Sequence, residues 1–367
     1  MSQPNAALVL SGGGVYAAYE VGVIRALADG CSPVTKGLPF DPAIITGTSS
    51  GAFNASYLTA FGDKDFAGSA RDLEYLWVNT LTSTCGNRVY RYRAFPTLCE
   101  LGTDGFRRTA ARLATDTVFI GTSFARSVAS SLQGDDSIPE RIMQVFDLTT
   151  VFDFGPFDEL VSQTIAVEKI PLSQRVLRVI VTNWDIGEAQ EFGNKDFAEE
   201  GSFRIITASA AIPGLLPPVY VNGTPYVDGG VLMNTPLSPA IHAGARTIHV
   251  IYMDPDLSTM STARFSNTLS AVDRLNLIRT AAIANADIDA AARINRSLAE
   301  QSAGRDSVAS EFRPLTIHRY RLRQDLGGTL GSLRFERDFV RALQQLGYEH
   351  AIEHDCELEE CVLPTNS

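Results

Sequence analysis

Apolar positions in the first sixty residues alternate between short continuous runs and longer segments of helical period. Residues 6–10 (AALVL) and 43–46 (AIIT) are continuous apolar runs, which is typical of strands buried on both faces. Residues 16–29 and 52–61 follow these runs and are predicted to be helices. This alternation predicts parallel strands with helices covering both faces of the sheet.

The second half of the chain carries further strand signals at wider intervals. Residues 176–182 (VLRVIVT) and 247–253 (TIHVIYM) predict two more strands of the same sheet. Between them, Asn222 and Gly223 separate two short β-prone runs, which indicates a two-residue hairpin turn. The alanine-rich residues 271–303 have a helical period. Together these elements predict an α/β fold.

The chain has no internal repeat and no low-complexity linker, so we expect one main domain. It is predicted to span residues 1–330, with a less regular capping or lid section at 72–165. Residues 331–367 are expected to form a C-terminal helix, at 335–346, and an acidic, solvated tail, at 353–360.

Composition narrows the class of protein. The 367 residues are 45% hydrophobic and 20% charged, enough to bury a large core. A formal charge of −11 argues against nucleic-acid binding and against broad contact with anionic membranes, so any lipid contact should be local and peripheral. No apolar run approaches the roughly 20 residues that span a bilayer, and no signal peptide is evident. These features predict a cytoplasmic protein.

The five cysteines form neither a disulfide framework nor a recognisable zinc motif, so free thiols are the favoured interpretation. We therefore expect no metal and no cofactor. Two pairs remain possible bridges if the protein is exported: Cys85 with Cys99, and Cys356 with Cys361.

Three glycines, Gly12, Gly13 and Gly14, lie between the first predicted strand and its helix. Such a junction points backbone N–H groups, and the positive end of the helix dipole, into open space. It binds an anion, either a nucleotide phosphate or a transient oxyanion. A nucleotide is disfavoured because the G-K-[ST] ending is absent, Ala17 replaces the third glycine of a dinucleotide fingerprint, and the expected acidic residue is missing.

Residues 47–51 read GTSSG, a G-x-S-x-G pattern in which Ser49 lies between Gly47 and Gly51. It follows a predicted strand and precedes a predicted helix, which is the context of a nucleophile elbow. The alternative is that Ser49 or Ser50 only caps the helix that follows.

A serine nucleophile needs a base. Asp228 ends a short predicted strand, and Gly229 and Gly230 after it leave room for another side chain. Partial burial would raise the pKa of this carboxylate and make it a better base. The alternative is an ordinary turn aspartate.

A histidine base is the competing possibility, because the order Ser49, Asp228, then His242 or His249 is that of an α/β-hydrolase. Only one predicted strand precedes this elbow, however, and neither histidine lies in a glycine-flanked loop. Structural roles are therefore favoured for both.

The glycine loop, the serine elbow and the distant Asp-Gly-Gly occur in the order typical of patatin-like phospholipases, and this sequence resembles that family. The matching segments are SGGGVYAAYEVGVIRAL, GTSSGAFNA, ASAAIPGLLPPV and YVDGGVLMNTPL, between residues 8 and 237. The resemblance implies a three-layer α/β/α sandwich with a mostly parallel central sheet. It also implies a Ser49–Asp228 dyad and oxyanion donors from Gly12, Gly13 and Gly14.

The implied activity is hydrolysis of a lipid acyl ester through an acyl-Ser49 intermediate, as in a phospholipase A, a lysophospholipase or an esterase. No cofactor is implied. A transacylase with the same acyl-enzyme and a carboxylesterase for non-phospholipid esters remain alternatives. Head group, chain length, cleavage position, need for an activator and oligomeric state stay open.

The sequence departs from the family where Val15, Tyr16 and Ala17 replace a variable residue, a cation and a glycine. Tyr16 offers a hydroxyl but no charge, and as a possible substrate contact it favours a neutral lipid, a lysolipid or a simple ester over a phospholipid.

Basic and aromatic residues also concentrate in the capping section, and they suggest a lid that touches lipid. The alternative is a solvated face whose arginines pair with carboxylates. The residues concerned are Arg88, Tyr90, Arg91, Tyr92, Arg93, Phe95, Phe106, Arg107, Arg108 and Arg112.

Overall fold

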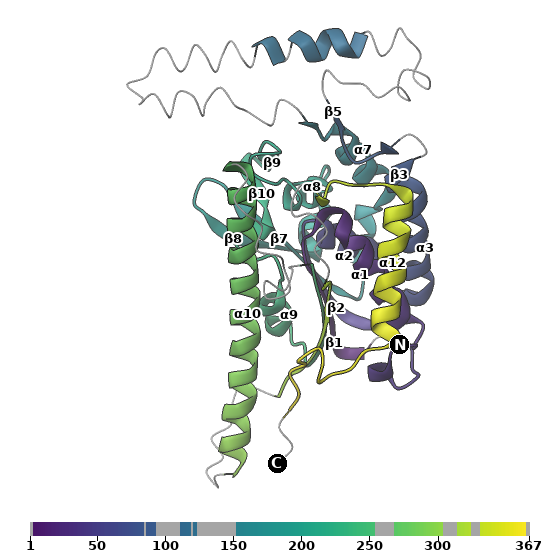
Figure 1. Ribbon diagram of the computed structural model, residues 1–367, viewed down its shortest axis with the longest axis vertical. Coiled ribbons are helices and arrows are strands. Elements are labelled where there is room, and N and C mark those ends of the chain that lie inside the picture. The colour runs from purple at the N-terminus through teal and green to yellow at the C-terminus, as the bar shows by residue number, and fades with distance from the viewer. Residues whose placement is uncertain are drawn as a thin grey trace.

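A computed structural model describes residues 3–83, 86–92, 111–118, 120–122, 152–253, 268–303, 314–323 and 331–364. Its centre is a sheet flanked by helices, with α10 on one side and α1, α3 and α12 on the other (Figure 1). The predicted three-layer α/β/α architecture is confirmed.

The central sheet has eight strands in the order β12-β11-β1-β2-β7-β10-β9, with β8 paired to β7. The strands from β12 to β7 are parallel, and β8, β9 and β10 add antiparallel pairs. Their bounds are β1 Gln3–Leu10, β2 Pro42–Thr48, β7 Val176–Asn183, β8 Glu188–Gly193, β9 Val219–Val221, β10 Thr224–Asp228, β11 Thr247–Tyr252 and β12 Thr316–Arg321. Short two-residue strands form two small ladders: β3 Thr82–Ser83 with β4 Gly86–Asn87, and β5 Arg91–Tyr92 with β6 Phe152–Asp153.

The helices connect and cover these strands. Their bounds are α1 Ala17–Ala28, α2 Ser50–Phe61, α3 Phe66–Leu76, α7 Gly155–Thr164, α8 Arg204–Ser209, α9 Leu237–His242, α10 Thr268–Ala303 and α12 Arg337–Ile352. A π-helical turn, Trp77–Leu81, continues α3. Every predicted strand and helix outside the capping section is present; most lie within three residues of their expected bounds, but α12, expected at 335–346, continues to Ile352.

The alternation of side chains along β1 divides the core between the two faces of the sheet. Leu8 and Leu10 pack in the cluster that includes α1, α2, α3 and α12. Ala7 and Val9 pack in a second cluster, with residues of α9 and α10. Because both faces of β1 are covered, its sequence is continuously apolar.

The predicted hairpin is also present. Asn222 and Gly223 join β9 to β10, and both have positive φ angles, of 50° and 83°. Two consecutive positive φ angles are typical of the type I′ turn, whose twist matches that of the strands. The hairpin delivers Asp228 to the end of β10.

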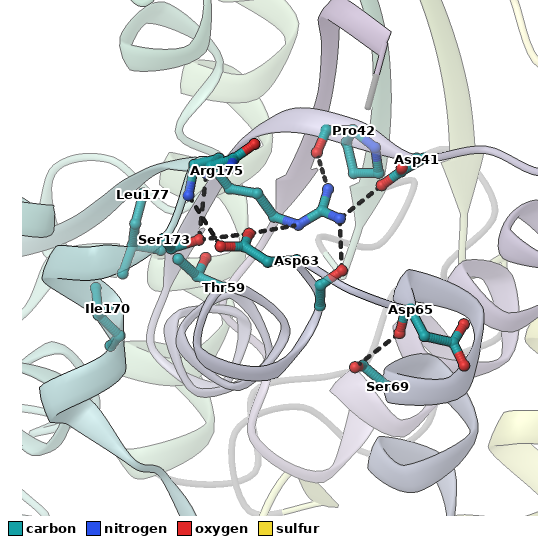
Figure 2. Close-up of polar contacts among 12 residues, drawn as sticks. Asp41, Pro42, Thr59, Asp63, Asp65, Ser69, Ile170, Ser173, Arg175 and Leu177 are labelled. Carbon is teal, nitrogen blue, oxygen red and sulfur yellow. Dashed lines mark hydrogen bonds and ion pairs between the residues drawn. The ribbon is translucent and has the colours of Figure 1, made fainter. Parts of the chain in front are cut away.

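A buried arginine fastens the β2–α2 unit to the start of β7 (Figure 2). Arg175 is 3% exposed and forms ion pairs with Asp41, at 2.6 Å, and Asp63, at 3.6 Å. Its guanidinium also donates to the carbonyl oxygens of Pro42 and Gly62. Since these groups lie just before β2, at its start and after α2, one side chain holds both ends of the unit that carries Ser49.

The C-terminal helix belongs to the same body as the sheet. Helix α12 crosses α1 so closely that a Cβ on Gly22 would lie 1.9 Å from the carbonyl oxygen of Gln344. The following residues are not simply solvated: His354 is 7% exposed, and Val362 exchanges two backbone hydrogen bonds with Ile317 of β12. The prediction of a solvated tail at 353–360 is therefore wrong for His354, whereas most of the other residues in that range are exposed as expected.

Much of the predicted lid lies outside the described residues, including Arg93, Phe95, Phe106, Arg107 and Arg108. Two of the described members are occupied elsewhere. Arg91 forms ion pairs with Asp116, at 2.7 Å, and Asp153, at 2.6 Å. Tyr90 is 9% exposed and donates to the carbonyl oxygen of Leu333 at 2.8 Å. The ion pairs of Arg91 agree with the alternative in which arginines pair with carboxylates, whereas Tyr90 is buried and contacts a residue outside the capping section.

Among the helices in the described ranges, none combines the length and the apolar character that crossing a bilayer requires.

Candidate active site

Ser49 lies in a sharp turn between β2 and α2. Its φ and ψ angles are 55° and −125°, a conformation that non-glycine residues rarely adopt and that costs on the order of 1–3 kcal/mol. The backbone N–H of Ser49 donates to Ser209 Oγ at 2.9 Å, and Ser209 Oγ donates to the carbonyl oxygen of Ile180 at 2.6 Å. The strained turn is thus held from β7 and α8, as a nucleophile elbow requires.

Asp228 lies at the end of β10, far from Ser49 in the sequence. Its carboxylate accepts a hydrogen bond, at 2.7 Å, from the N–H of Gly230, and it lies near enough to Ser49 for that side chain to lower its pKa. Burial raises the pKa of Asp228 to about 6, although the N–H of Gly230 and the side chain of Ser49 act in the opposite direction. A carboxyl group with this pKa is mostly ionised at neutral pH, where it can accept a proton.

The histidines lie elsewhere. His249 Nδ1 is 3.0 Å from the Tyr320 hydroxyl, and His350 Nδ1 is 3.0 Å from the Tyr19 hydroxyl. His242 is exposed at the end of α9. His318 and His354 contact cysteines near the C-terminus. The α/β-hydrolase alternative finds no histidine partner for Ser49 among the hydrogen bonds of the described residues.

The glycine loop lies beside Ser49, and only some of its backbone N–H groups are already hydrogen-bonded within the protein. The N–H of Gly12 donates to the carbonyl oxygen of Asn234 at 3.1 Å, and Asn234 Nδ2 donates back to the Gly12 carbonyl at 3.1 Å. A Cβ on Gly12 would lie 2.9 Å from that of Ser49. Gly12 therefore provides close approach, and its expected role as an oxyanion donor does not fit this conformation.

Gly13 and Gly14 carry the remaining donors of the loop. The N–H of Gly13 donates to Ser50 Oγ at 3.1 Å, a hydroxyl that can rotate away. The N–H of Gly14 has no hydrogen-bond partner among the described residues. Gly14 has a φ of 57°, and a Cβ there would lie 2.5 Å from the carbonyl oxygen of Ser332. Both conditions require glycine.

The other glycines of the two motifs allow the backbone segments to pack. A Cβ on Gly47, Gly51 or Gly229 would lie 2.4–2.5 Å from a backbone carbonyl oxygen, and one on Gly230 would lie 2.7 Å from Asn234 Oδ1.

Sequence reasoning missed Asn234 and Ser209, which hold the glycine loop and the elbow. Both lie within segments that carry the resemblance, in MNTP and ASAAIPG, but neither has a reactive side chain that would draw attention.

An apolar pocket, partly open to solvent, leads away from Ser49. Its walls are almost entirely hydrophobic, and they come from α2, the π-helical turn, α7 and two segments far apart in the sequence. The lining residues are Gly14, Ser49, Ser50, Phe53, Trp77, Leu81, Val89, Phe154, Phe157, Ala210, Ile212, Leu333 and Phe335. Such a pocket can accept a hydrocarbon chain beside the serine.

Tyr16 does not line this pocket. It is 8% exposed and packs in the core beneath the glycine loop. The prediction that Tyr16 contacts substrate therefore has no support in the structure, and an arginine there would bury a charge.

A buried polar network supports Trp77, one of the residues that line the pocket. Glu20 of α1 accepts a hydrogen bond from Asn54 Nδ2 at 2.9 Å, and Asn54 Oδ1 accepts one from Trp77 Nε1 at 2.8 Å. Complete burial raises the pKa of Glu20 well above its ordinary value, even though Asn54 and the Ser11 backbone lower it. Burial therefore favours the neutral form of Glu20, whose carboxyl group holds Asn54, and Asn54 in turn holds the pocket residue Trp77.

Comparison with known proteins supports this arrangement at the family level. The family described as patatin-like phospholipase matches residues 8–241, which include the glycine loop, the elbow and Asp228. A search of curated proteins finds no match.

Two solved structures show a distant likeness. VipD from Legionella pneumophila has 13% identity and a TM-score of 0.35, over 95% of this chain and 67% of that one. The type III effector protein ExoU has 16% identity and a TM-score of 0.31, over 98% of this chain and 54% of that one. This chain thus spans only about half the length of the second structure.

Proposed function

Because the chain belongs to the patatin-like phospholipase family, we propose that it is a lipid acyl hydrolase in which Ser49 and Asp228 form a catalytic dyad. The observation that carries the proposal is the strained Ser49 turn, with the buried Asp228 carboxylate near it, beside an apolar pocket. The family match supports lipid hydrolysis in general, and the dyad is inferred from the geometry.

In the proposed reaction, Asp228 takes the hydroxyl proton as Ser49 Oγ attacks the ester carbonyl carbon. The negative charge that develops on the carbonyl oxygen is stabilised by the N–H of Gly14, and by that of Gly13 once Ser50 Oγ rotates away. The positive end of α2, where Ser49 lies, acts in the same direction. Protonated Asp228 then donates to the departing alcohol, leaving an acyl-Ser49 ester.

The second half of the reaction reverses these roles. Asp228 removes a proton from a water molecule, which attacks the acyl carbon, and the carboxylic acid leaves as Ser49 recovers its proton. No metal or organic cofactor is needed for either step. If an alcohol or lysolipid takes the place of water, the same acyl-enzyme gives a transacylase.

The pocket indicates the substrate class. Its walls offer aromatic and aliphatic contacts, and each methylene that they bury is worth about 0.8 kcal/mol. Among the described residues that line the pocket, none has a charged side chain. We therefore propose a substrate with a medium or long acyl chain, and a carboxylesterase for short esters is the less favoured alternative.

The test is a panel of phospholipids, lysophospholipids, acylglycerols and p-nitrophenyl esters, assayed with wild type, Ser49→Ala and Ser56→Ala. Ser56 is a matched control because its buried hydroxyl, also on α2, has no hydrogen-bond partner. We expect hydrolysis by wild type and Ser56→Ala, and a loss of at least about a thousandfold in Ser49→Ala. Full activity in Ser49→Ala would overturn the proposal. Products measured with an added alcohol distinguish hydrolysis from transfer.

A further inference from the structure

Two histidines and two cysteines converge where the C-terminal segment lies against β12. His318 belongs to β12, and His354, Cys356 and Cys361 belong to the segment after α12. One nitrogen or sulfur atom from each lies within 4.8 Å of the other three. Both cysteines are free thiols in the structure.

The distances within this cluster match those between ligands of a tetrahedral metal. Cys356 Sγ is 3.5 Å from His318 Nδ1 and 3.6 Å from His354 Nε2, and Cys361 Sγ is 3.4 Å from His354 Nε2. Ordinary Zn–S and Zn–N bonds at a tetrahedral angle place sulfur and nitrogen about 3.5 Å apart. The widest pair exceeds this separation by little more than about 1 Å, a gap that side-chain rotation can close.

The surroundings of the four side chains also suit a metal. The backbone N–H of Arg319 donates to Cys361 Sγ at 3.4 Å, a contact that stabilises a thiolate. His354 is 7% exposed, and its Nδ1 is buried with no hydrogen-bond partner among the described residues. Within that part of the chain, the polar contacts of the ring are those of Nε2 with the two sulfurs. A buried imidazole held only by such weak partners is costly, whereas a metal bond would satisfy Nε2.

We propose that His318, His354, Cys356 and Cys361 form a structural Zn²⁺ site. Two thiolates and two imidazoles at tetrahedral spacing are the donor set that zinc prefers, and two negative sulfurs balance the charge of the ion. With four protein ligands the site is closed, so its role is structural and separate from ester hydrolysis. This proposal replaces the expectation from the sequence that the protein holds no metal.

The zinc would connect the end of α12 to the outer strand of the sheet. Helix α12 ends at Ile352, two residues before His354, and Val362, next to Cys361, already pairs with Ile317. The segment that leads into α12 carries Leu333 and Phe335, which line the pocket. The clamp would therefore fix the helix whose other end leads to the wall of the pocket.

A disulfide between Cys356 and Cys361 is the alternative chemistry for this cluster. It would use both thiols and leave His318 and His354 facing a weak acceptor. It would also give no reason for a histidine on β12 to lie 3.5 Å from Cys356 Sγ. The zinc site accounts for all four residues.

The test begins with the whole chain, produced with a histidine-free affinity tag in zinc-containing medium and freed of loose metal by gel filtration. Elemental analysis should find one zinc per chain in wild type and in Cys31→Ser, the matched control for an exposed free thiol. The double variant Cys356→Ser/Cys361→Ser should lose the zinc, with its fold checked by circular dichroism.

Wild type alone decides the question if the double variant does not fold. Replacement of zinc by Co²⁺ should give the strong visible absorption of a tetrahedral site and a thiolate-to-cobalt band in the near ultraviolet. A chelator should lower the thermal midpoint of wild type but not that of a folded double variant. Three results would overturn the proposal: wild type without zinc or a cobalt spectrum, zinc retained by the double variant, or a Cys356–Cys361 disulfide in freshly purified protein.

Discussion

The buried Asp228 carboxylate makes a specific prediction about pH. Its pKa of about 6, raised by burial from an ordinary value of 3.8, means that about nine tenths of the molecules carry the ionised base at pH 7 and about one tenth at pH 5. Because only the ionised form can accept the Ser49 proton, kcat/KM should fall about tenfold between pH 7 and pH 5. A carboxylate with the ordinary pKa would stay mostly ionised over this range.

The assay measures kcat/KM from pH 5 to pH 8 with a neutral ester whose charge does not change, while intrinsic fluorescence reports whether the protein stays folded. Asp228→Asn is the matching variant, because it keeps the acceptor for Gly230 and removes the base. It should lose nearly all activity at every pH. A flat profile between pH 5 and pH 7, or an active Asp228→Asn, would refute the assignment.

The same pKa makes a prediction about stability. A carboxyl whose folded-state pKa is raised stabilises the fold fully below pH 3.8, and this contribution is lost as the pH rises to about 6. The difference corresponds to about 3 kcal/mol. Asp228→Asn should therefore be more stable than wild type at pH 7, by up to that amount, in urea unfolding. An ordinary turn aspartate would gain no stability from the substitution.

Three further predictions concern the scaffold and the pocket. Arg175→Met should lower the free energy of unfolding by about 3 kcal/mol, because it removes the buried cation that pairs with Asp41 and Asp63 and that donates to two carbonyl oxygens. The partly exposed Arg178→Met should cost less than about 1 kcal/mol, and equal losses in urea unfolding would contradict the role of Arg175. Because the pKa of Glu20 is raised in the folded state, wild type should lose stability as the pH rises above 4.5, and Glu20→Gln should not. The stability of Glu20→Gln relative to wild type, measured by urea unfolding, should therefore be greater at pH 8 than at pH 5. An equal difference at the two pH values would mean that the pKa of Glu20 is not raised. Phe157→Ala should raise KM several-fold for a dodecanoyl ester and little for an acetate, since Phe157 lines the pocket. Equal changes in KM for both esters would mean that the acyl chain binds elsewhere.

The parts of the fold and site that were predicted from sequence are those with local signals. Apolar runs identified the parallel strands because both of their faces are buried, and G-x-S-x-G identified the elbow because its glycines allow backbone contact that side chains would block. The pairing of Ser49 with Asp228 came from the resemblance, since no local pattern joins residues 179 positions apart.

The features that were missed depend on long-range contacts. The N–H of Gly12 is occupied because it donates to the carbonyl oxygen of Asn234, a residue far away in the sequence, and no spacing rule indicates that bond. Tyr16 packs in the core instead of lining the pocket, and that depends on the tertiary packing around it. The cysteine and histidine cluster forms only when the segment after α12 returns to β12, 36 residues from His318 to His354, which no short zinc motif describes.

The most direct test of the central claim, that Ser49 is the acyl-accepting nucleophile, is to map where a fluorophosphonate reacts. Wild type would be treated briefly and digested, and the modified peptide would be identified by mass spectrometry. The dyad predicts one modification, on Ser49, that Ser49→Ala abolishes and Asp228→Asn slows strongly. Modification of a different serine, or equal labelling of wild type and Ser49→Ala, would contradict it.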